Sequence, residues 1–176
     1  MTTVFQYGSN TLESEINSKK RLNGAARFVG IAETVEPYEL VFDVFSNNRG
    51  CAMANIVTSH EGKKVWGILY DVPDNLISRQ TTPKGSKSFD AIEGEGVNHR
   101  RHCLRVRKPN GEELIALTYV TLKPTKRLKR ASIDYVRLII SGLREHKISD
   151  EYINQVKQAV KKHSPSVLSL TVLYIF

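Results

Sequence analysis

Short apolar segments that each end at a turn signal fill the first two thirds of the chain and constrain its fold more than any other feature. Segments of this length, rich in β-branched and aromatic residues and bounded by Gly, Pro or Asn, are typical of β-strands. They predict strands at residues 4–6, 26–35, 38–46, 51–59, 64–72, 102–108 and 114–122. The last two strands flank Pro109, Asn110 and Gly111, a combination that favours a hairpin turn.

Apolar residues at helical spacing replace this pattern near the end of the chain. They predict helices at 133–145 and 150–163, and a weaker stripe predicts an earlier helix over 12–22, capped by Ser9 or Asn10. Strands followed by helices indicate a strand-rich α+β domain in which the late helices pack outside the sheet.

Length and composition indicate one globular domain. The 176 residues are 40% hydrophobic and 25% charged, which is ordinary for a folded domain. We expect a single domain over 1–163. The apolar tail that follows, 164–176, alternates like a strand, and it would pair either with this chain's own sheet or with a partner in a homodimer.

The sequence predicts a cytoplasmic protein. Its first residues lack the basic start and apolar run of a signal peptide, and no segment has the roughly 20 apolar residues that cross a bilayer. Cys51 and Cys103 match no metal or redox spacing, and the five histidines show no paired metal spacing. We therefore expect reduced thiols, no membrane partner, no metal and no other cofactor.

A net charge of +8 favours anionic partners, and basic residues gather at 98–108 and 123–130. Nucleic acid is one candidate. However, the second segment lacks the interleaved aromatic residues that stack on bases, and such a segment is most often a solvated loop and the start of a helix. We expect no nucleic-acid partner. A non-catalytic binding module that contacts nucleic acid through these segments is the alternative function.

Tyr7, Gly8, Ser9 and Asn10 form a tight polar turn between the first strand and the first predicted helix. The glycine lets the backbone come close to a ligand, and the N–H groups of the following turn suit a carboxylate or a phosphate. An ordinary helix cap would have the same spacing. From spacing alone, the cap is the better interpretation.

Glu93 is the candidate general base. It follows an apolar residue at the end of a predicted helical turn, and Gly94 and Gly96 open the backbone around it. A carboxyl group that is partly buried beside a cleft suits proton transfer at neutral pH. A surface acid that neutralises Arg100 and Arg101 is the alternative, and from these residues alone it is the better interpretation. The sequence leaves open whether Glu95 assists.

Seven motifs occur in one order along the chain: VFQYGSN, GIAETVEPYEL, ANIV, VWGILYDV, FDAIEGEG with RRHCLRV, ALTYV, and YVRLIISGLREHKISDEYI. In this order they resemble the gamma-glutamylcyclotransferase-like family (the AIG2-like group), and the resemblance spans roughly residues 3–160. It implies a small mixed β-barrel with flanking helices and a cleft at the barrel mouth.

The resemblance also implies an enzyme of the transferase or lyase type that uses no cofactor. In its reaction, the free α-amino group of a gamma-glutamyl compound attacks the γ-carbonyl, which closes 5-oxoproline and releases an amine, an amino acid or a peptide. Glu93 matches the family's catalytic glutamate. The turn formed by Tyr7, Gly8, Ser9 and Asn10 would hold the substrate's α-carboxylate, which makes it a carboxylate clamp.

Two further positions follow from the resemblance. Tyr119 matches a tyrosine that faces the site, although a tyrosine packed in the strand core is an equally good interpretation. His99 falls nearest to a position where many relatives carry tyrosine, beside the pocket for the leaving group. Because Arg100 and Arg101 follow directly, we expect His99 to favour a more polar or anionic leaving group than a simple amine.

Overall fold

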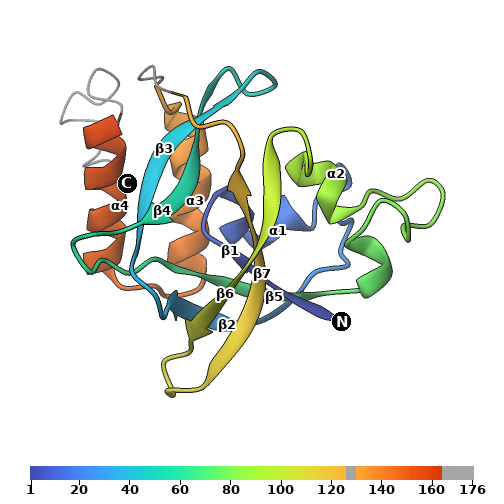
Figure 1. Cartoon of the computed structure of the whole chain (residues 1–176), viewed down its shortest axis with the longest axis horizontal. Helices are drawn as coiled ribbons and strands as arrows, with labels where there is room; N and C mark the ends of the chain where they lie inside the picture. The colour runs from blue at the N-terminus through green and yellow to red at the C-terminus, as the bar shows by residue number, and fades with distance from the viewer. Residues whose placement is uncertain (126–129, 164–176) are drawn as a thin grey trace.

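The computed structural model describes residues 1–125 and 130–163. Five strands close into a barrel in the order β1-β5-β2-β6-β7 (Figure 1). Their bounds are β1 Thr2–Gln6, β2 Arg27–Thr34, β5 Trp66–Val72, β6 His99–Arg107 and β7 Glu113–Thr121. Neighbouring strands run antiparallel, except that β1 and β7 are parallel where they close the barrel at Val4 and Leu117.

A second, two-stranded sheet stands beside the barrel. β3 (Tyr38–Ser46) and β4 (Cys51–Thr58) form an antiparallel hairpin whose register shifts between Val41 and Val44. The turn at its tip contains Arg49 and ends at Gly50, which has a left-handed φ of 63°. This hairpin rises beyond the barrel and forms one wall of the site described below.

The two long helices pack outside the strands, as the sequence predicted. α3 (Ile133–Glu145) lies against the segment that follows β1, and α4 (Asp150–His163) lies against β3 (Figure 1). The side chain of Ser132 caps α3 by accepting a hydrogen bond from the N–H of Tyr135 at 3.2 Å. The buried face of α3 holds Tyr135, Val136, Ile139, Ile140, Gly142 and Leu143.

The α+β class predicted from the sequence is confirmed, and β3, α3 and α4 have the predicted bounds. The helix predicted over 12–22 is wrong. A 3₁₀ turn, η1 (Ser9–Thr11), leads into a single helical turn, α1 (Glu13–Ile16). Asn17 ends it, because its side chain bonds the backbone N–H and C=O of Ala26, each at 2.9 Å. Such bonds compete with helix formation.

The predicted cap also needs correction. Gly8, not Ser9 or Asn10, is the residue that precedes η1, and no side chain caps that turn. Leu12 holds the same position before α1, again without a side-chain bond. A further 3₁₀ turn, η2 (Asp74–Leu76), was not predicted, and β6 begins three residues before its predicted start.

The predicted strand in the apolar tail lies outside the described residues. Over the rest of the chain, the structure contains no helix with the length and apolar character needed to span a bilayer.

Candidate active site

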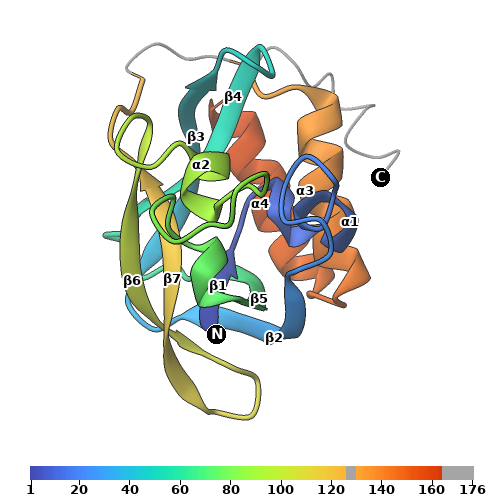
Figure 2. The ribbon, with the colours of Figure 1, turned by 90° about the vertical axis from the view of Figure 1, so that its right-hand side faces the viewer.

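A cleft of about 450 Å³ brings together the candidate residues from distant parts of the sequence. It lies between the turn after β1, the short helix α2 (Phe89–Glu93), the start of β6, and the β3–β4 hairpin. Figure 2 views the molecule from the face that carries α2. Its lining includes every candidate named from the sequence: Tyr7, Gly8, Ser9, Asn10, Glu93, His99 and Tyr119.

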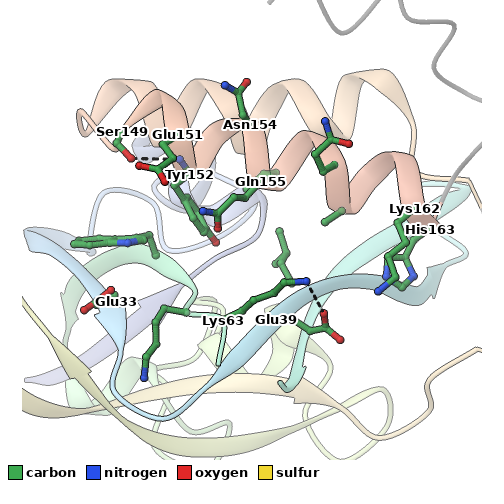
Figure 3. A pocket seen from close by; sticks show the side chains of 16 residues that line it. Glu33, Glu39, Lys63, Ser149, Glu151, Tyr152, Asn154, Gln155, Lys162 and His163 are labelled. Atoms are coloured by element: carbon green, nitrogen blue, oxygen red, sulfur yellow. Dashed lines mark hydrogen bonds and ion pairs between the residues drawn. The ribbon is translucent and has the colours of Figure 1, made fainter. Parts of the chain in front are cut away.

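A larger cavity of about 890 Å³ lies between α4, β3 and the segment before β5 (Figure 3). None of the candidate residues lines it. Lys63, one of its cations, already pairs with Glu39 at 3.7 Å and with Glu61 at 2.5 Å. Size therefore does not identify the site here, because the smaller cleft holds the chemically suited groups.

The turn at residues 7–10 lines the cleft and carries two backbone donors without a protein acceptor. β1 ends at Gln6, and the first bond of η1 runs from Thr11 N–H to the carbonyl of Gly8 at 3.1 Å. Among the described residues, the N–H groups of Ser9 and Asn10 have no protein acceptor. A side chain at Gly8 would come within 3.2 Å of the Tyr135 hydroxyl, so the close approach of α3 favours glycine there.

Glu93 meets this turn through Asn10. The Nδ2 of Asn10 donates to Oε1 of Glu93 at 2.7 Å and to Oε1 of Gln6 at 3.1 Å. Ser88 caps α2 by accepting from the N–H of Ala91 at 3.1 Å. Gly94, with a φ of 68°, ends the helix directly after Glu93, so the carboxylate stands at the last position of a short, capped turn.

The orientation of the Asn10 amide follows from these bonds. Gln6 donates its own Nε2 to the carbonyl of Phe5 at 3.0 Å, so its oxygen faces Asn10. A reversed Asn10 amide would place its oxygen against two acceptors. In the observed orientation, Oδ1 of Asn10 is buried and has no hydrogen-bond partner among the described residues. A buried acceptor without a donor is costly, and a ligand's N–H would satisfy it.

Asp90, also on α2, bonds residues of β6 and β7. Its side chain is 5% exposed, pairs with Arg101 and accepts from the Tyr119 hydroxyl at 2.7 Å. Burial raises the pKa of Asp90, but the bonds from Arg101 and Tyr119 outweigh it and hold that pKa below its ordinary value. The carboxylate is therefore ionised at neutral pH.

Two tyrosines of the cleft stay neutral. The hydroxyl of Tyr7 donates to the carbonyl of Tyr119 at 2.6 Å, and burial, with the nearby charge of Glu93, raises the pKa of Tyr7 well above its ordinary value. Burial and the bond to Asp90 likewise raise the pKa of Tyr119. Tyr119 is 4% exposed and also lines the cleft. It is therefore both packed in the strand core and in contact with the site, so the two interpretations drawn from the sequence do not exclude each other.

His99 stands at the start of β6 and supports the end of α2. Its Nδ1 donates to the backbone carbonyl of Glu93 at 2.6 Å, which fixes the orientation of the ring. Arg101 is directed to Asp90, and neither Arg100 nor Arg101 lines the cleft. Glu93 therefore does not neutralise these arginines in the way the alternative interpretation of the sequence predicted.

Sequence reasoning missed three charged residues of this site. Asp90 carried a usable signal, because it precedes Glu93 by three residues and helical spacing places the two on neighbouring positions. Arg21 and Arg49 carried none. They line the cleft from the segment after α1 and from the tip of the β3–β4 hairpin, and both bond Glu15.

The fold and the cleft define a class: a closed mixed barrel with a polar site that joins a loop after the first strand to a glutamate on a short helix. Within this class, the chain belongs to the family described as gamma-glutamyl cyclotransferase, AIG2-like, whose model matches residues 4–137. No curated protein matches the sequence significantly.

Solved structures share the fold at low sequence identity. One described as a gamma-glutamyl cyclotransferase superposes with a TM-score of 0.73 at 21% identity, covering 89% of this chain and 86% of the other. An uncharacterized human protein gives 0.73 at 23%, with the same coverage. YkqA from Bacillus subtilis gives 0.72 at 19%, and the match spans 93% of this chain but 55% of YkqA. These likenesses confirm the fold.

Proposed function

We propose that this protein is a gamma-glutamyl cyclotransferase that converts a gamma-glutamyl compound to 5-oxoproline and a free amine, amino acid or peptide. One observation carries the proposal: the Glu93 carboxylate is held at 2.7 Å by Asn10, a residue of the turn that presents unpaired backbone donors to the same cleft. Family membership supports the same reaction.

The reaction needs one group that moves protons. The attacking α-amino group is an ammonium at neutral pH, so a base must first remove a proton. After attack on the γ-carbonyl, the ring nitrogen must lose a second proton and the departing nitrogen must gain one, so that a lactam and a neutral amine result. Glu93 performs both steps, as general base and then as general acid. Because nucleophile and electrophile belong to one molecule, the enzyme's other task is to hold the folded-back substrate.

The turn at residues 7–10 fixes that conformer. The N–H groups of Ser9 and Asn10 bind the substrate's α-carboxylate, which brings its α-ammonium between Glu93 and the unpaired Oδ1 of Asn10. Tyr7 and Tyr119 remain uncharged and do not repel the carboxylate. The buried acceptor of Asn10 then gains a donor only when the substrate is bound.

The test measures 5-oxoproline from gamma-glutamyl-alanine, glutathione and ε-(gamma-glutamyl)-lysine, with Glu93→Gln and the control Glu95→Gln. Glu95 does not line the cleft. We expect Glu93→Gln to lower kcat about 10²- to 10⁴-fold, the usual contribution of general acid–base catalysis. Glu95→Gln should retain activity. If the wild-type protein forms no 5-oxoproline from any of the three compounds, the proposal is wrong and a binding module becomes the better interpretation.

A further inference from the structure

Arg21 and Arg49 share a single carboxylate at the edge of the cleft. Each donates through Nη2 to the same oxygen of Glu15, Arg21 at 3.2 Å and Arg49 at a shorter distance. The three side chains are 19–30% exposed. Because arginine stays charged, two cations facing one anion leave a net positive charge beside the site.

Both guanidinium groups keep donors for a ligand. Each carries five N–H donors, and Glu15 accepts one hydrogen bond from each. Arg21 and Arg49 line the cleft, whereas Glu15 does not. A planar carboxylate is the group that such donors bind best, through paired hydrogen bonds.

The position of Arg49 separates it from the turn at residues 7–10. Its guanidinium lies over the ring of Tyr135, 5.6 Å from the ring centroid. The hydroxyl at the far end of that ring approaches Gly8 and accepts from the N–H of Ala54 at 3.1 Å. Arg49 therefore contacts the face of the Tyr135 ring, whereas the turn lies at the hydroxyl edge of the same ring. The arginine and the backbone donors of the turn are thus two distinct groups of the cleft that suit anions.

We infer that Arg49 and Arg21 form a subsite for a carboxylate on the leaving group, so that the preferred substrate releases an amino acid or peptide with a free carboxylate near the scissile amide. The inference rests on the proposed function and narrows its substrate class. It also replaces the expectation that Arg100 and Arg101 supply this charge, since those residues lie outside the cleft.

A matched pair of substrates tests the subsite: gamma-glutamyl-alanine and gamma-glutamyl-alaninamide, which differ only in the leaving group's charge. We expect wild-type kcat/KM to favour the carboxylate about ten- to a hundredfold, the range of a hydrogen-bonded charge. Arg49→Gln and Arg21→Gln should each lower this ratio while changing turnover of the amide little. Glu15→Gln, which removes the competing carboxylate, should raise the ratio.

Arg100→Gln is the control, because it removes the same charge from an exposed position outside the cleft. Its ratio should equal that of the wild-type protein. Equal use of both substrates by the wild-type protein would overturn the subsite and leave the cyclotransferase proposal intact. If Arg49→Gln lowered kcat/KM equally for both substrates, the arginines would instead bind the gamma-glutamyl part of the substrate or support the structure. That result would also overturn the subsite. Absence of 5-oxoproline from both substrates would overturn the subsite, and turnover of glutathione or ε-(gamma-glutamyl)-lysine would then decide whether the cyclotransferase proposal stands.

Discussion

Arg101 donates two hydrogen bonds to the carboxylate of Asp90, from Nε to Oδ1 at 2.9 Å and from Nη2 to Oδ2 at 2.5 Å. The same carboxylate accepts from Tyr119. Because Asp90 and Glu93 belong to the same short helix α2, the bonds from Arg101 and Tyr119 tie the helix that carries Glu93 to both β6 and β7. The position of the candidate base thus depends on a buried acid that performs no chemistry itself.

Asp90→Asn should therefore destabilise the protein. The substitution leaves Arg101 without its anion, and we expect a loss of about 2–3 kcal/mol in the free energy of unfolding at pH 7, less than for a fully buried pair because Arg101 is 41% exposed. Urea denaturation measures it. Asp134→Asn, at a carboxylate that is 90% exposed, should change stability by less than about 1 kcal/mol.

The difference between wild type and Asp90→Asn should depend on pH. The pKa of Asp90 is lower in the folded protein than in the unfolded chain, so its contribution is fully present above about pH 4 and is lost as the pH falls through the folded-state pKa. Unfolding measured at pH 7, 5 and 3 should show a constant difference that shrinks only at the last. A difference that grows in acid would contradict this role.

Gly142→Ala should disturb the turn at residues 7–10. Gly142 is buried in α3, and an added Cβ would collide with backbone atoms of Thr11 and Leu12. Alanine gains about 1 kcal/mol in helix propensity, but overpacking costs about 1–3 kcal/mol and backbone atoms yield little. We expect a lower melting temperature and a raised KM. Ser141→Ala, at the exposed neighbouring position, should show neither effect.

Asn10→Ala should lower kcat about tenfold or more, because it removes the donor to Glu93 and the unpaired acceptor together. Asn17→Ala is the matched control. The side chain of Asn17 bonds the backbone of Ala26 and does not line the cleft, so its loss should reduce stability and leave kcat unchanged at a temperature where the protein is folded. Equal kcat values for Asn10→Ala and the wild-type protein would refute the role proposed for Asn10.

His99→Tyr tests the influence of this position on the leaving group. The imidazole bonds the backbone of Glu93 and lines the cleft, so its replacement should change the relative rates with gamma-glutamyl-alanine and ε-(gamma-glutamyl)-lysine. We expect the ratio of the two rates to change by about threefold, which corresponds to half the free energy of one hydrogen bond. An unchanged ranking of the two substrates would end the specificity role.

Much of the fold was accessible from the sequence, because α3 and α4 carry apolar stripes at helical spacing and the strands end at turn residues. The helix predicted over 12–22 was wrong, which shows the limit of a prediction from local pattern. Asn17 ends α1 by bonding Ala26, nine residues away, and no local pattern signals this bond. The turn and Glu93 were found through family motifs. Arg21 and Arg49 could not be found in this way, because their ion pairs with Glu15 depend on how a distant hairpin packs beside the cleft.

The parallel contact between β1 and β7 has a consequence for how the protein comes to be active. β1 is made first during synthesis, yet its last barrel neighbour follows more than a hundred residues later. Pairings this distant in sequence form slowly. A nascent chain that ends before β7 holds both the turn and Glu93 but lacks the strand that closes the barrel beside them. We expect the proposed activity to require that closing step, so the first 5-oxoproline would report that the whole barrel has assembled.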